Sequence, residues 1–101
     1  MLPLSSTEQK PLEFSSTETS QIHRMSTNKI GWLHTLADQR GAKFDIVIKD
    51  NRGNEILRKA NCGNDTEKFG ELINLPTMVG QDLEVEVENL KGATKLQVFL
   101  N

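Results

Sequence analysis

Four carboxylates at alternate positions are the densest group of chemically capable side chains in the sequence. This acidic row consists of Asp82, Glu84, Glu86 and Glu88. On a β-strand, alternate side chains share one face and lie roughly 6.6–6.8 Å apart. That spacing is too wide for two neighbours to share one tightly bound Ca²⁺ without ligands from elsewhere. We favour a solvated outer face paired with basic residues such as Lys49, Arg58 or Lys95, and a docking strip for a basic partner is the alternative.

His23, His34 and Cys62 are the other side chains that could bind a metal or take part in catalysis. The histidines are eleven residues apart with no third ligand at a recognisable spacing, so neither a zinc site nor a dyad is indicated. Cys62 has no nucleophile signature and no obvious activating base. The turn at 50–55 lacks the ligand pattern of a calcium loop. We therefore expect no catalytic residue, no metal site and no cofactor.

Short segments with a two-residue hydrophobic period predict that the carriers of these side chains are β-strands. The alternation is most regular in 44–49 and 83–88, and 96–100 directs Leu96, Val98 and Leu100 to one side. Less regular strands are expected at 55–59, 69–75 and 30–36, and a helical turn is the alternative for the Leu- and Ala-rich end of the last of these. No βαβ pattern is present. The sequence predicts an all-β fold, a single small antiparallel β-sandwich or jelly-roll-like domain.

Turn-forming residues separate the expected strands. The segment 50–54 reads Asp-Asn-Arg-Gly-Asn and predicts a tight hairpin between 43–50 and 55–61. The segment 89–92, which ends in a glycine, predicts a second hairpin between the last two strands.

Two aromatic residues of the body are candidates for an exposed site. Because aromatic residues make up only 5% of the chain, we expect Trp32 in the core, and stacking on a sugar ring is the alternative. Phe99 alternates with the inward-facing residues of 96–100, so we expect it on the outer face. There it could meet a neighbouring subunit or pack beneath the arm described next.

The N-terminal part of the chain repeats itself after ten residues. Both copies end in Ser-Ser-Thr-Glu, preceded by Leu-Pro-Leu in one and Leu-Glu-Phe in the other. Chance similarity and a pair of helix capping boxes are the alternatives to a functional repeat. We predict an extended Ser/Thr-rich arm over 1–28 and a β-sandwich over 29–101, and we expect deletion of 1–20 to change the melting temperature by only a few degrees. The anchors that the arm offers to a partner are Leu2, Leu4, Leu12 and Phe14.

Composition excludes several classes of partner. The chain has 101 residues, a net charge of −2 and a single cysteine. A nucleic-acid surface usually carries a basic excess that is missing here. One cysteine cannot form an internal disulfide framework, and no signal peptide or membrane-spanning stretch is indicated. We expect a protein made in a reducing cell, with no nucleic-acid and no membrane partner.

These features favour a non-catalytic structural protein of a large assembly. The preferred hypothesis is a viral or phage capsid decoration (cement) protein that docks through its N-terminal arm. Its partners would be protein subunits such as a capsid protein, and copies of itself in a homo-oligomer. Two weak anchors on one tether suit a lattice that repeats its own sites. The alternatives are a carbohydrate-binding or adhesion β-sandwich and a phage tail or baseplate subunit. The expected location is the virion, assembled in the host cytoplasm, or otherwise the cytoplasm.

Overall fold

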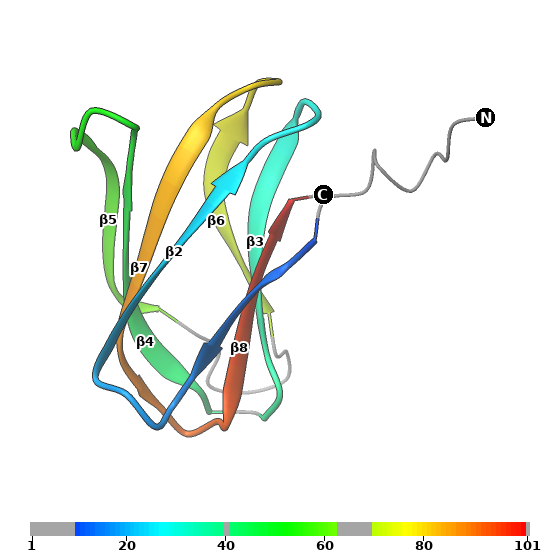
Figure 1. Cartoon of the computed structure of the whole chain (residues 1–101). Helices are drawn as coiled ribbons and strands as arrows, with labels where there is room; N and C mark the ends of the chain where they lie inside the picture. The colour runs from blue at the N-terminus through cyan, green and yellow to red at the C-terminus, as the bar shows by residue number, and fades with distance from the viewer. Residues whose placement is uncertain (1–9, 40, 63–69, 101) are drawn as a thin grey trace.

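In the part of the chain that the structure describes, eight β-strands form two sheets (Figure 1). The computed structural model describes residues 10–39, 41–62 and 70–100. The strand order is β1-β8-β3-β6 in one sheet and β2-β7-β4-β5 in the other, and all neighbouring strands are antiparallel. The expected all-β antiparallel sandwich is confirmed. The strands are β1 (Leu12–Ser15), β2 (Ser20–Ser26), β3 (Gly31–Ala37), β4 (Lys43–Lys49), β5 (Glu55–Cys62), β6 (Gly70–Thr77), β7 (Asp82–Lys91) and β8 (Lys95–Leu100).

The core lies between the two sheets and is filled by alternate residues of the strands. Along β7, Leu83, Val85 and Val87 are buried. Along β8, the expected inward residues Leu96, Val98 and Leu100 are also buried. A strand exposes successive side chains on opposite faces, so each of these strands has one apolar and one more polar side. The alternation predicted for both strands is therefore confirmed.

A β-bulge at Asn89 keeps the end of β7 in phase with the core. Asp45 of β4 faces Glu88, whereas Lys43 faces Lys91, so β7 contains one extra residue between these pairs. Asn89 takes up this extra residue with a φ of 57°, which asparagine tolerates better than most side chains. As a result Leu90, only 6% exposed, turns inward.

The two predicted hairpins have different outcomes. The turn at 50–54 joins β4 to β5, with Asp50 and Asn54 linked by a backbone hydrogen bond and Gly53 at a φ of 85°, so this hairpin is confirmed. The hairpin at 89–92 is wrong, because β7 and β8 belong to different sheets. The chain crosses between the sheets at Gly92, where a Cβ atom would lie 2.5 Å from the Gly41 carbonyl oxygen.

The segment 12–26 belongs to the sandwich, which corrects the predicted arm of 1–28. It forms β1, which pairs with β8, and β2, which pairs with β7. Phe14 is 2% exposed within the core, and Leu12 packs against that core. The Ser/Thr-rich composition concealed two edge strands, because an edge strand needs few apolar residues on its outer side. The described chain begins at residue 10, so Leu2 and Leu4 lie outside it.

We expect Phe14→Ala to destabilise the isolated domain by about 3–5 kcal/mol, because it leaves a cavity between the sheets. Urea unfolding of the purified chain measures this loss. The matched control is Glu13→Ala, since Glu13 is the exposed neighbour on the same strand. Equal stability of the two variants would contradict the placement of Phe14. Deletion of 1–20 should now also be strongly destabilising, because it removes β1.

Candidate interaction surface

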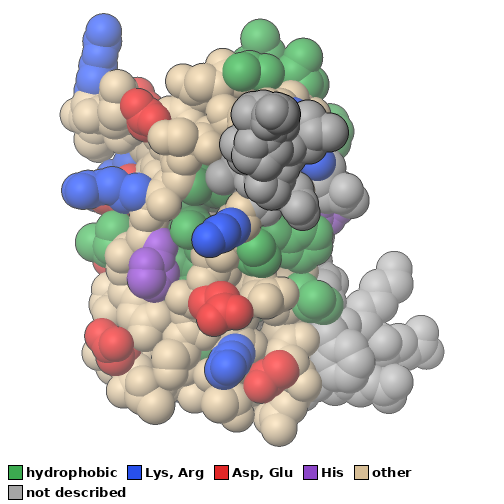
Figure 2. All heavy atoms as spheres, turned by 45° about the vertical axis from the view of Figure 1, so that its right-hand side comes forward, with side chains coloured by type: hydrophobic (Ala, Val, Ile, Leu, Met, Phe, Trp, Pro, Cys, Tyr) green, Lys and Arg blue, Asp and Glu red, His purple; other side chains and the backbone are tan. Residues whose placement is uncertain are grey.

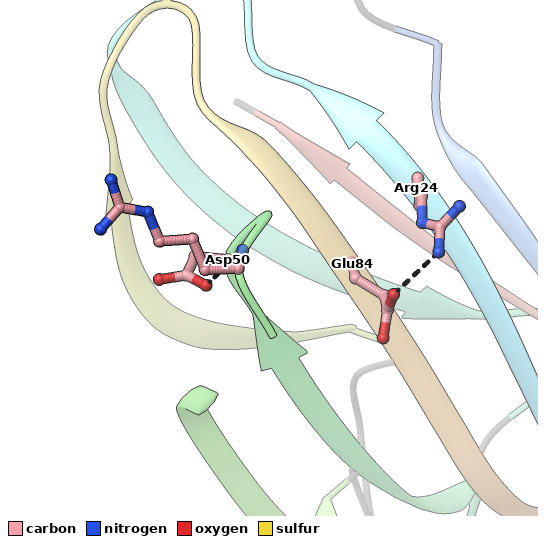
Figure 3. Close-up of polar contacts among 4 residues, drawn as sticks. Arg24, Asp50 and Glu84 are labelled. Atoms are coloured by element: carbon pink, nitrogen blue, oxygen red, sulfur yellow. Dashed lines mark hydrogen bonds and ion pairs between the residues drawn. The ribbon is translucent and has the colours of Figure 1, made fainter. Parts of the chain in front are cut away.

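The acidic row lies on the outer face of β7, where neighbouring strands neutralise or hydrogen-bond its carboxylates. Arg24 of β2 places Nη2 3.2 Å from Oε1 of Glu84 (Figure 3). The hydroxyl of Ser26 donates to Asp82 over 2.6 Å. The hydroxyl of Ser20 similarly donates to a Glu86 oxygen over 3.0 Å. This row therefore forms part of a polar, largely paired outer face.

The bases expected to pair with the acidic row are distributed differently. Lys49 of β4 faces Glu84 in the register, as expected. Arg58 places Nη2 2.8 Å from Oε1 of Glu55 on its own strand. The hydrogen bond between them raises the pKa of Arg58 and lowers the pKa of Glu55. Lys95 belongs to β8 in the other sheet. Arg24, the base that does reach the row, was missed because β2 was taken for part of an arm.

A hollow of about 400 Å³ lies between the acidic row, β2 and the hairpin at 50–54. The Asp50 carboxylate at its rim accepts the backbone N–H groups of Asn54 and Arg52, each over 2.9 Å. These hydrogen bonds, the one from Asn54 above all, lower the pKa of Asp50. Its oxygens thus stabilise the turn. Within the described ranges, no group of three or more His, Cys, Asp and Glu side chains is arranged to hold a metal ion.

The outer face of the other sheet carries apolar and aromatic side chains. Trp32 and Leu36 of β3 are 44% and 41% exposed. Between them on the same face, the His34 ring stacks on Phe99 of β8, with centroids 5.4 Å apart and planes at 15°. The outward position of Phe99 is confirmed.

The expectation that Trp32 lies in the core is wrong. Pairing with β8 places Leu33 opposite Leu100 and Ala37 opposite Leu96, so these positions of β3 face inward. Leu33 is fully buried and takes the position in the core. Because Trp32 is its neighbour, the alternation of the strand directs the indole outward.

Two connections extend this apolar face to one end of the sandwich. The backbone N–H of Gly80 donates to the Thr27 carbonyl oxygen over 2.7 Å, and the buried Thr27 hydroxyl hydrogen-bonds the Met78 carbonyl oxygen. The segment 27–30 is thereby held against 77–81. Ile30, Met78 and Val79 on these segments are 71%, 61% and 65% exposed.

Figure 2 shows hydrophobic side chains gathered at the upper end of the molecule, where the β2–β3 and β6–β7 connections lie in Figure 1. Large apolar groups left in water in this way mark surfaces that bind other molecules. The sequence offered two hints of this surface, which were the outward phase of Phe99 and a pair of apolar residues, Met78 and Val79, inside a turn. We call the following set the apolar surface: Ile30, Trp32, Leu36, Met78, Val79 and Phe99.

The structure separates the residues that the sequence grouped as a possible interface. Phe99 and the acidic row lie on outer faces of opposite sheets. Leu12 and Phe14 contribute to the protein's own core rather than to a free anchor. Cys62 is 3% exposed, and its thiol donates to the Lys59 carbonyl oxygen over 3.5 Å.

Comparisons with known proteins provide no relative for this chain. No family model matches it, and no curated protein or solved structure is significantly similar to it. In the described part of the chain, no helix is long and apolar enough to cross a membrane.

The exposure of Trp32 can be measured directly, because it is the only tryptophan of the chain. We expect red-shifted fluorescence and efficient quenching by acrylamide in the folded protein, since the indole is in contact with water. The control is the same measurement in denaturant, which should increase quenching only slightly. Emission typical of a buried indole, with strong protection in the folded state, would contradict the placement of Trp32.

Proposed function

We propose that this chain is a non-catalytic structural protein that docks onto protein subunits of a larger assembly through its apolar surface. The observation that carries the proposal is the difference between the two outer faces. One sheet pairs its carboxylates with Arg24 and with serine hydroxyls, and its exposed Ile22 and Ile56 lie on its two opposite edge strands. The other sheet exposes Trp32 and Leu36 on a single inner strand. A soluble antiparallel sandwich can keep both outer faces polar, so the apolar face indicates a surface that a partner covers.

The composition of the apolar surface supports a protein partner. Tryptophan and methionine are enriched where protein interfaces are most buried, and both are exposed here, as Trp32 and Met78. Ile30 and Val79 add aliphatic area without hydrogen-bonding groups. The connections that carry these side chains are fixed by hydrogen bonds around Thr27, so docking would require little ordering of the backbone.

A carbohydrate-binding or adhesion module is the second candidate, and the exposed indole of Trp32 is the observation that favours it. A sugar ring needs hydrogen-bonding groups around the aromatic platform that it stacks on. Ile30 and Val79, two of the most exposed side chains at this end, are instead aliphatic. A protein surface suits them better.

The assembly itself is proposed from the sequence alone. A viral or phage particle, with the chain as a capsid decoration protein or as a tail or baseplate subunit, stays the preferred setting. Docking through an arm now depends on Leu2 and Leu4, since Leu12 and Phe14 lie in or against the core.

We expect the double variant Met78→Ser and Val79→Ser to bind its assembly at least roughly 100-fold more weakly. Each of these side chains should contribute about 1.5–3 kcal/mol to binding when the partner buries it. Titration of purified particles with each variant, with occupancy measured by gel densitometry, tests this. The stability of the free chain should not change, because both side chains are exposed.

The matched control is Glu86→Gln on the opposite outer face, which should bind like the wild type. Wild-type occupancy of the double variant would overturn docking through this surface. Retained particle binding by Trp32→Ser together with loss of binding to an immobilised glycan would favour the carbohydrate module instead.

A further inference from the structure

The four edge strands of the described sheets, β1, β6, β2 and β5, differ in how well they resist the addition of another strand. Exposed edges invite pairing with other chains, and proteins block them with prolines, bulges, charges or side-chain caps. The edge strand β5 has two irregularities in its register with β4 and carries Arg58 and Lys59. The edge strand β6 has a register shift and contains Pro76, which lacks a backbone donor.

The edge of β1 is capped by a side chain. The amide of Gln21 accepts the backbone N–H of Ser15 over 2.9 Å and donates to the carbonyl oxygen of the same residue over 3.2 Å. The N–H of Ser16, by contrast, donates to the carbonyl oxygen of Thr94, the residue just before β8. By the alternation of an antiparallel ladder, the outward backbone groups of β1 belong to Glu13 and Ser15, and those of Pro11, just before the strand, continue the same edge. Pro11 has no N–H and Ser15 is occupied, so this edge offers little to a new strand.

The edge of β2 carries one charged side chain, Arg24, but has no proline, bulge or side-chain cap within the described residues 20–26. It pairs with β7 in unbroken register over its whole length. On either side of that ladder, Thr27 donates to the Gln81 carbonyl oxygen and Asn89 donates to the Thr19 carbonyl oxygen. The odd-numbered residues therefore direct their backbone groups toward β7. The even-numbered residues present theirs at the free edge: Ser20, Ile22, Arg24 and Ser26.

We infer that β2 is a homodimer interface, in which β2 of a second copy adds antiparallel and joins two four-stranded sheets into one. Among registers of two antiparallel β2 strands, the one centred on His23 pairs all seven residues. It sets Ile22 opposite Arg24 of the second copy, and Ser20 opposite Ser26. This interface is the free edge of β2, whereas the apolar surface covers the outer face of the other sheet and two connections. The inference therefore does not depend on the proposed docking function.

The side chains of β2 are complementary to a second copy of themselves. Ile22 is 51% exposed, and the Arg24 side chain is 81% exposed. The aliphatic stem of Arg24 in one copy can therefore cover Ile22 of the other copy. In the second copy, Glu86 of β7 lies beside the Ile22 that faces Arg24 of the first copy. Arg24 would then stand between Glu84 of its own chain and Glu86 of the second copy. A pairing of two β5 strands centred on Arg58 and Lys59 would instead oppose like charges.

Disulfide trapping tests the register. In this arrangement His23 faces His23 of the second copy as a pair without hydrogen bonds, with Cα atoms about 4.5 Å apart, which is within reach of a disulfide. We expect His23→Cys, in a Cys62→Ala background, to give a covalent dimer on mild oxidation. The control Ser20→Cys should stay monomeric on a denaturing gel, since its counterpart would be ~20 Å away. A dimer with Ser20→Cys, or none with His23→Cys, would overturn the inference.

Proline substitution tests the edge by a second route. Ile22→Pro removes an N–H that faces outward, so it costs no bond to β7 but takes a donor from the dimer. We expect analytical ultracentrifugation at micromolar protein concentration to give a molecular mass of twice 11.3 kDa for the wild type. The same measurement should give the mass of a single chain for Ile22→Pro. Glu13→Pro removes an outward N–H from β1 and should leave the dimer intact. A monomeric wild type, or a folded Ile22→Pro dimer, would overturn the inference.

Discussion

The two-residue alternation of side chains is the constraint on which this structure depends. A core between two sheets can accept only one face of each strand, so the phase of each strand decides which side chains are buried. At the centre, Leu33, Val85 and Leu96 are all in phase. The bulge at Asn89 shows how strictly the phase is kept, because the chain accepts a left-handed residue there and Leu90 stays in the core. A slip of one residue on β3 would exchange Leu33 for Trp32 and bring His34 inside.

The sequence predicted the parts of the fold in which alternation and turn chemistry agree. The strands around 44–49, 83–88 and 96–100 and the hairpin at 50–54 have both signals, and the structure contains them. The strands β1 and β2 have few apolar residues, because one side of each is stabilised by polar contacts that a sequence pattern does not show.

The phase of β3 was ambiguous, since both Trp32-His34-Leu36 and Leu33-Thr35-Ala37 alternate. Only pairing with β8 resolves it. For the candidate surface, Phe99 was predictable from alternation on one strand. Trp32 and Leu36 follow from the phase of β3. Ile30, Met78 and Val79 come together through the contacts of Thr27 with the segment 77–81, which join positions about fifty residues apart in the sequence.

The two sheets divide the surface chemistry of the molecule between them. On the sheet that contains β7, polar partners surround the carboxylates of the acidic row, so these charges are already matched within their own chain. On the sheet that contains β3, the indole of Trp32 and the side chain of Leu36 have no such polar matching. A rigid sandwich can thus offer a face for association without exposing its core, because burial of Leu33 and exposure of Trp32 follow from the same alternation.

The Gln21 amide that bridges the N–H and carbonyl groups of Ser15 has a consequence for polymerisation. A sheet with two open edges can recruit strands at both ends and grow into a fibre. Here the amide takes the position of a further strand on one sheet, and the irregular, charged β5 ends the other. This leaves β2 as a regular open edge in the described part of the chain. In the proposed dimer the β2 edge is consumed by pairing with its own copy, so growth by strand addition would stop at a closed pair. Together with that pairing, a polar side chain on the inner side of one edge strand would oppose the formation of fibrils.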